Sequence, residues 1–115
     1  MTNETLKTIE TRRSCRAYKP EQITEEELEA VLRAGTYAPS AKNLQSAKIM
    51  VVQDAATRAE LSRMNAAVMG SDKDPMYGAP TILLVIADAH NPNAVADGSL
   101  VMQNLMLAAA SLGLG

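Results

Sequence analysis

Hydrophobic and polar residues follow two different spacings along this chain, and each spacing predicts a different kind of element. Apolar residues three and four positions apart predict amphipathic helices over about 3–14, 24–35 and 55–69. The runs 47–52 and 81–87 are apolar apart from Lys48 and Thr81 and predict β-strands, the second of them typical of a strand covered on both faces. A last helix, over about 94–112, is apolar on nearly every side, so we expect it to be buried within its own domain or against a partner.

The predicted helices begin at residues that can accept free backbone N–H groups. Asn3 and Asp54 are suitable N-caps for the first and third helices. Thr24 and Glu27 match a capping box at the start of the second helix, which Gly35 or the following Ala-Pro pair closes. The expected buried stripes are Leu28, Val31 and Leu32 in the second helix, and Leu61, Met64 and Val68 in the third.

Together these elements predict an α+β fold in which helices flank a sheet of only two strands. Two strands are too few to be stable without more sheet or a partner. The sequence also stops at 113–115, where a C-cap glycine would turn the backbone toward a further element. We therefore expect residues 1–115 to form a single domain that is incomplete, with the remaining structure supplied by residues outside the sequence or by a second copy.

Composition and charge narrow the functional classes. Hydrophobic residues make up 47% of the chain and charged residues 21%, a balance typical of globular proteins. The formal charge of −2 argues against a broad electrostatic surface for nucleic acid or an anionic membrane, and no apolar run is long enough to span a bilayer. Cys15 and His90 are the only residues of their types and cannot build a structural zinc site, so we expect no metal and a reducing, cytoplasmic setting.

Two polar clusters are candidates for ligand binding. Arg12, Arg13, Ser14 and Arg16 place three guanidinium groups and a hydroxyl within five residues, a donor set that matches phosphate oxygens. The same arginines could instead complement the negative end of the first helix, and their spacing alone leaves both interpretations open. The second cluster, residues 38–45, concentrates amide and hydroxyl donors, although a plain surface loop would have the same composition.

Four motifs, taken in order, resemble the FMN-dependent nitroreductase family. They are Arg-Arg-Ser-x-Arg at 12–16, Ala-Pro-Ser-x-x-Asn-x-Gln at 38–45, Gly-Ala-Pro before the strand at 81–87, and Asp97 through Gln103-Asn104-Leu105 to the final Gly-Leu-Gly. Each motif is short, but the ordered set is specific. The resemblance covers essentially the whole chain and corresponds to the N-terminal part of the family domain.

The resemblance implies an α+β homodimer with helices around a mostly antiparallel sheet and two FMN sites at the subunit interface. It assigns the FMN phosphate and ribityl tail to Arg12, Arg13 and Ser14, and the pyrimidine side of the ring to Arg16. It assigns contacts with the flavin of the other subunit to Pro39, Ser40 and Asn43, and a ring-contacting amide to Asn65.

The activity implied by the resemblance is a ping-pong transfer of electrons from NAD(P)H to a nitroaromatic compound, a quinone or a similar acceptor. Because the flavin supplies the redox chemistry, we expect no catalytic acid, base or nucleophile among the side chains. Ser46 and Ala47 depart from the Pro and Trp of many members, which affects the expected shape of the substrate pocket.

Two alternatives to an enzyme remain at this stage. A shortened chain could be a non-catalytic module that only binds flavin or dimerises. The cluster at 12–16 could also belong to a small regulatory protein that binds an anion.

Overall fold

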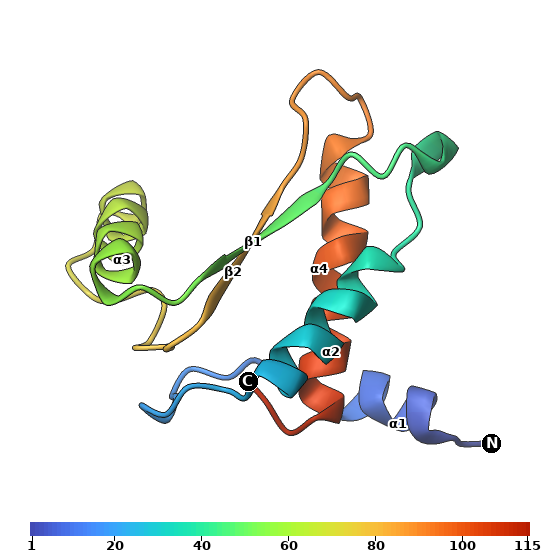
Figure 1. Cartoon of the computed structure of the whole chain (residues 1–115), viewed down its shortest axis with the longest axis horizontal. Helices are drawn as coiled ribbons and strands as arrows, with labels where there is room; N and C mark the ends of the chain where they lie inside the picture. The colour runs from blue at the N-terminus through green and yellow to red at the C-terminus, as the bar shows by residue number, and fades with distance from the viewer.

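Two long helices and a two-stranded sheet form the centre of the computed structural model, which describes residues 1–115 (Figure 1). The element order is α1 (Glu4–Thr11), α2 (Glu25–Thr36), the 3-10 turn η1 (Ala41–Asn43), β1 (Lys48–Val52), α3 (Ala55–Met69), β2 (Ile82–Ile86) and α4 (Ala94–Ser111). The predicted α+β class and the order of its six main elements are confirmed.

The sheet is antiparallel, and its two strands are joined through α3. Lys48 pairs with Ile86 at one end and Val52 with Ile82 at the other. Because side chains alternate between the two faces of a strand, Ile49 and Val85, which are paired, share one face. This face packs against α2 and α4.

The core lies where α2, α4 and this sheet face meet. Val31 of α2 packs there with Val101 and Leu105 of α4. The Asn104 side-chain amide also donates to the carbonyl oxygen of Ala34 at 2.9 Å, which satisfies a carbonyl near the C-terminal end of α2. These contacts fix α2 along α4.

The predicted helix starts are confirmed, but the end of α1 differs from the prediction. Asn3, Thr24 and Asp54 each accept an N–H in the first turn of their helices, and Glu27 completes the capping box. Helix α1 ends at Thr11 because Arg12 turns into an extended conformation, with ψ of 137°. The three arginines therefore lie in a loop after α1 and not in its last turn.

Less of the apolar surface is covered than the pattern predicted. Only 8 of 115 residues are buried, and the radius of gyration is 15.1 Å, against about 13 Å for a compact domain of this length. In β2 only Ile82 is buried, and the face expected on α3 is exposed at Met64 (51%) and Val68 (89%). The physical reason is that α3 lies apart from α2 and α4 (Figure 1), so neither of these helices covers its exposed apolar residues.

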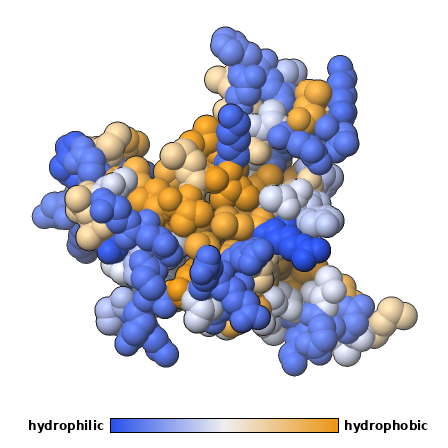
Figure 2. All heavy atoms as spheres, viewed as in Figure 1, coloured by the Kyte–Doolittle hydropathy of each residue, from blue (hydrophilic) through white to orange (hydrophobic).

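Helix α4 is likewise covered on one side only by the rest of this chain, so the first of its two expected environments, burial within its own domain, is not found. Apolar residues remain exposed on its other sides, namely Val95, Leu100, Met102 and Met106, and Leu112 is exposed just after the helix ends. Figure 2 shows hydrophobic residues gathered in the middle of one face of the molecule, with hydrophilic residues toward its extremities. None of the helices combines the length and hydrophobicity that a bilayer-spanning segment needs.

Candidate functional site

The loop after α1 carries guanidinium groups that are free to bind an anion. Arg12 is half-buried and Arg16 is exposed, and neither side chain donates a hydrogen bond within the chain. Arg13 is different, because its Nη1 donates to the carbonyl oxygens of Glu10 and Arg12 at 2.8 Å each. Arg13 therefore stabilises the C-terminal end of α1, as one interpretation of the sequence predicted. All side-chain N–H donors of Arg12 and Arg16 remain unpaired.

This arginine loop, residues 12–18, lies at the C-terminal end of α4. Gly115 packs against it so closely that an added Cβ would be 2.8 Å from Cβ of Cys15 and 2.6 Å from the Tyr18 ring. The Tyr18 hydroxyl donates to the Cys15 carbonyl oxygen at 3.1 Å, which fixes the loop. Burial, followed by the influence of Cys15, raises the pKa of Tyr18 above its usual 10.0.

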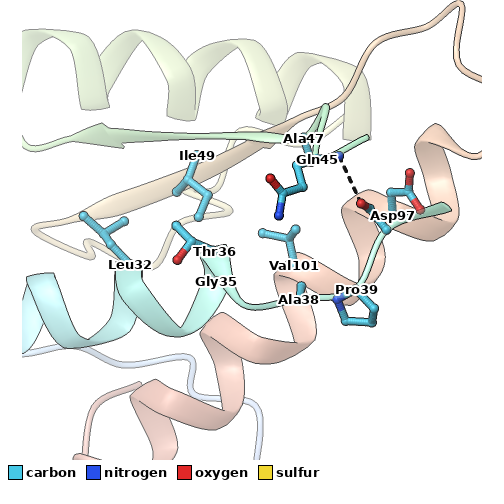
Figure 3. A pocket seen from close by; sticks show the side chains of 11 residues that line it. Leu32, Gly35, Thr36, Ala38, Pro39, Gln45, Ala47, Ile49, Asp97 and Val101 are labelled. Carbon is cyan, nitrogen blue, oxygen red and sulfur yellow. Dashed lines mark hydrogen bonds between the residues drawn. The ribbon is translucent and has the colours of Figure 1, made fainter. Parts of the chain in front are cut away.

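The second predicted cluster forms a tight loop at the opposite, N-terminal end of α4. In this loop, residues 39–45, the Ser40 hydroxyl accepts the Gln45 backbone N–H at 3.0 Å (Figure 3). Lys42, Asn43 and Gln45 have positive φ values of 55°, 53° and 52°. Asparagine adopts this left-handed conformation more readily than lysine or glutamine, so the loop needs support from its surroundings.

Asp97 supplies that support, although the sequence pattern gave its side chain no specific role. Its side chain is 3% exposed, and Oδ1 accepts the Ala41 backbone N–H at 3.0 Å. Oδ2 is buried with no partner, a situation that costs about 1–3 kcal/mol. An acidic residue in the first turn of an otherwise apolar helix was the available sequence signal, but its partner lies 56 residues away.

A cavity of about 400 Å³ opens between this loop, α2, β1 and α4 (Figure 3). Pro39, Ser40 and Asp97 belong to its lining, whereas Asn43 does not. Its walls combine apolar side chains with a few hydroxyl, amide and carboxyl groups, the composition typical of small-molecule sites. The remaining lining residues are Leu32, Gly35, Thr36, Ala38, Gln45, Ala47, Ile49 and Val101.

One chain does not bring the predicted site residues together. The arginine loop and the 39–45 loop lie at opposite ends of α4, whose 18 residues span about 27 Å. Asn65 lies on α3, exposed, with its amide nitrogen donating to the Leu61 carbonyl oxygen at 2.9 Å. No group of three or more His, Cys, Asp or Glu side chains is arranged to hold a metal ion.

Comparison with known proteins supports the family resemblance that the ordered motifs indicate. The model of the nitroreductase family matches residues 9–73 and 66–115. A candidate NADH dehydrogenase/NAD(P)H nitroreductase of Archaeoglobus fulgidus is 38% identical over 97% of this chain, and a Vibrio harveyi NADPH-flavin oxidoreductase is 30% identical over 98%. The chain spans 64% and 52% of the lengths of these two relatives.

Solved structures agree with this result at the level of the fold. A Bacteroides fragilis nitroreductase with bound FMN superimposes with a TM-score of 0.86 at 35% identity, covering 97% of this chain and 67% of its own. A Desulfitobacterium hafniense nitroreductase with bound FMN gives 0.87 at 33% identity, covering 98% and 68%. The family model and these structures, both covering nearly all of the sequence, show that this chain belongs to the nitroreductase family.

Proposed function

We propose that this chain binds FMN and forms part of a cytoplasmic NAD(P)H oxidoreductase of the nitroreductase type. The observation that carries the proposal is the likeness to two nitroreductases with bound FMN, at 33–35% identity over nearly the whole chain. Two further relatives are named as an NADPH-flavin oxidoreductase and an FMN reductase that uses NAD(P)H. Bound FMN would accept a hydride from NAD(P)H and pass electrons to a quinone, a nitroaromatic compound or a similar acceptor in a ping-pong cycle.

The arginine loop is our proposed site for the FMN phosphate. The free donors of Arg12 support this assignment, with Arg13 and Ser14 completing the contacts to the phosphate and ribityl tail. Guanidinium groups suit this task because their forked donors match phosphate oxygens. We assign Arg16 to the pyrimidine side of the ring, where a cation stabilises the negative charge of the reduced flavin.

The opposite positions of the two loops support a site shared between two copies. Pro39, Ser40 and Asn43 cannot reach a small ligand held by the arginine loop of the same chain, because α4 separates them. In a homodimer they would contact the flavin held by the other copy, and Asn65 would contribute its side-chain amide to the ring. The apolar residues exposed on α4 give such a dimer a surface to bury.

Fluorescence titration of FMN into the purified full-length protein tests this proposal. Replacing both Arg12 and Arg16 with Ala removes two charge-assisted contacts of about 1.5–3 kcal/mol each, so we expect at least roughly a hundredfold weaker binding. Arg63→Ala is the control, because it removes an exposed arginine of α3 whose guanidinium is paired with Glu60 and belongs to neither loop. Equal affinity in the double variant and the control would contradict the assignment.

A turnover assay separates an enzyme from a non-catalytic flavin-binding module. Oxidation of NADH or NADPH in the presence of FMN and a quinone supports the oxidoreductase. Tight FMN binding without turnover under those conditions would instead favour the module.

A further inference from the structure

We propose that Asp97 is a positioning residue that holds the 39–45 loop in its flavin-contacting shape through the Ala41 backbone N–H. The proposal rests on the proposed FMN site and adds a residue outside the set assigned to contact the flavin. Asp97 acts through the loop, as a hydrogen-bond acceptor, and does not itself touch the cofactor.

The bond between Asp97 and Ala41 is the only hydrogen bond from residues 39–45 to another element. All other hydrogen bonds made by this loop close within it, including Gln45 N–H to Ser40 Oγ at 3.0 Å and Asn43 N–H to the Ser40 carbonyl oxygen at 3.0 Å. Asn91 Nδ2 adds a bond to Ser46 Oγ at 3.0 Å, but that bond lies just after the loop. Asp97 therefore supplies the one hydrogen bond that ties residues 39–45 directly to α4.

The loop needs such an anchor because its backbone is strained. Lys42 and Gln45 occupy the left-handed region with φ of 55° and 52°, a conformation that such side chains rarely adopt. Strained residues persist where surrounding contacts hold them in place. Without the Asp97 acceptor, we expect the loop to relax and Ser40 and Asn43 to leave their flavin-contacting positions.

The burial of Asp97 also points to a role beyond packing. Its neighbours in α4, one and two turns further on, are the core residues Val101 and Leu105, so an apolar side chain would suit this position. The carboxylate instead leaves Oδ2 buried and unpaired, which is unfavourable for folding. Asp97 lines the same cavity as the loop residues Pro39 and Ser40, so its acceptor lies beside two of the residues proposed to contact the flavin.

Hydrogen exchange of the Ala41 amide measures this tether without any cofactor. In Asp97→Ala we expect exchange at Ala41 to be at least tenfold faster, measured against the amides within α4, which report global stability. In Asp97→Asn the side-chain oxygen can still accept, so exchange should stay within threefold of the wild type. Asp88→Ala is the matched control, because it removes an exposed carboxylate near the same end of α4.

FMN titration of the same variants links the tether to the cofactor. We expect about tenfold weaker binding in Asp97→Ala and a change of less than threefold in Asp97→Asn and in Asp88→Ala. A loss in Asp97→Asn equal to that in Asp97→Ala would overturn the acceptor role.

A second variant keeps the test valid if Asp97→Ala does not fold. Ala41→Pro removes only the donor, at the first residue of η1, where proline is tolerated, and the preceding Ser40 is already extended with φ −139° and ψ 153°. We expect Ala41→Pro alone to lose FMN affinity about tenfold. If Asp97→Ala does fold, combining the two substitutions should give no further loss.

Failure of the tether and failure of the proposed FMN site give different results. Unchanged Ala41 exchange in Asp97→Ala overturns the tether, and faster exchange with unchanged FMN affinity overturns its link to the site. If the wild-type protein binds no FMN, the proposed function fails, while the exchange data still decide whether the tether exists.

Discussion

Gly35 of α2 faces both β1 and α4. A Cβ added there would lie 2.7 Å from Cδ1 of Ile49 and 2.7 Å from Cδ2 of Leu105. Ile49 borders the cavity and could move, but Leu105 is only 3% exposed and has little free space around it. Gly35 therefore allows the close helix packing that defines one wall of the cavity.

We expect Gly35→Ala to lower the free energy of unfolding by about 1–2 kcal/mol. The gain of about 0.5–1 kcal/mol in helix propensity is smaller than the cost of overpacking at Leu105, about 1–3 kcal/mol. Chemical denaturation measures the change. Gly98→Ala in α4 is the matched control, since its new Cβ would be 3.8 Å from the nearest side-chain atom, and it should stabilise the protein. Stabilisation by both substitutions would contradict the packing argument.

At the scale of single residues, the sequence predicts interactions between near neighbours and misses distant ones. The caps formed by Asn3 and Asp54 bond to residues three positions away, so their residue types were sufficient to predict them. The bond between Asp97 and Ala41 joins residues 56 positions apart, and no local pattern indicates it. The left-handed Lys42 was equally unpredictable, because its conformation is imposed by the loop and not by its side chain.

Among the elements, α3 depends most on local interactions. Its only buried residue is Ala66, so tertiary contacts contribute little to its stability. Asp54 caps its first turn by accepting the Thr57 backbone N–H at 2.8 Å and the Thr57 hydroxyl at 2.7 Å. These two bonds lower the pKa of Asp54 below its usual 3.8, the hydroxyl being the larger cause.

This shift predicts that α3 loosens in acid. Because the pKa is lower in the folded state, the contribution of the cap is present above the usual value of 3.8 and is lost as the pH falls through the folded-state pKa. Asp54→Ala should show the same loosening at neutral pH, with roughly tenfold faster amide exchange in the first turn of α3. Hydrogen exchange followed by NMR gives both measurements.

Asp72→Ala is the control for this experiment, because Asp72 is exposed and its carboxylate accepts no hydrogen bond. If α3 exchanged equally slowly in Asp54→Ala and Asp72→Ala, the cap would not determine the stability of this helix.

The sequence predicted where each helix and strand lies better than which of their faces are covered. Periodicity located α3 and β2 correctly, since it reflects the conformation of the segment itself. It also predicted burial for Met64 and Val68, which are exposed because α2 and α4 do not cover α3. Which face of a helix or strand is buried depends on the elements that pack against it, and a local sequence pattern does not specify these.

Within one chain, the proposed site is divided between the two ends of α4. Three guanidinium groups lie at one end of α4, and the strained loop held by Asp97 lies at the other. Exposed apolar side chains lie on α4 between these ends, including Leu100, Met102 and Met106. The family resemblance assigns the arginine loop and the 39–45 loop to the same FMN molecule. Because the two loops lie at opposite ends of one chain, this assignment requires that each FMN be bound by two copies.

The shared site can be tested by mixing two defective chains. One carries Arg12→Ala with Arg16→Ala, and the other carries Ser40→Ala with Asn43→Ala, so each alone should bind FMN weakly. After joint unfolding and refolding at equal amounts, half of the dimers contain both chains, and each of these holds one intact site. We therefore expect the mixture to recover about a quarter of the wild-type FMN capacity. A mixture that binds no more FMN than the separate variants would contradict a site built from both copies.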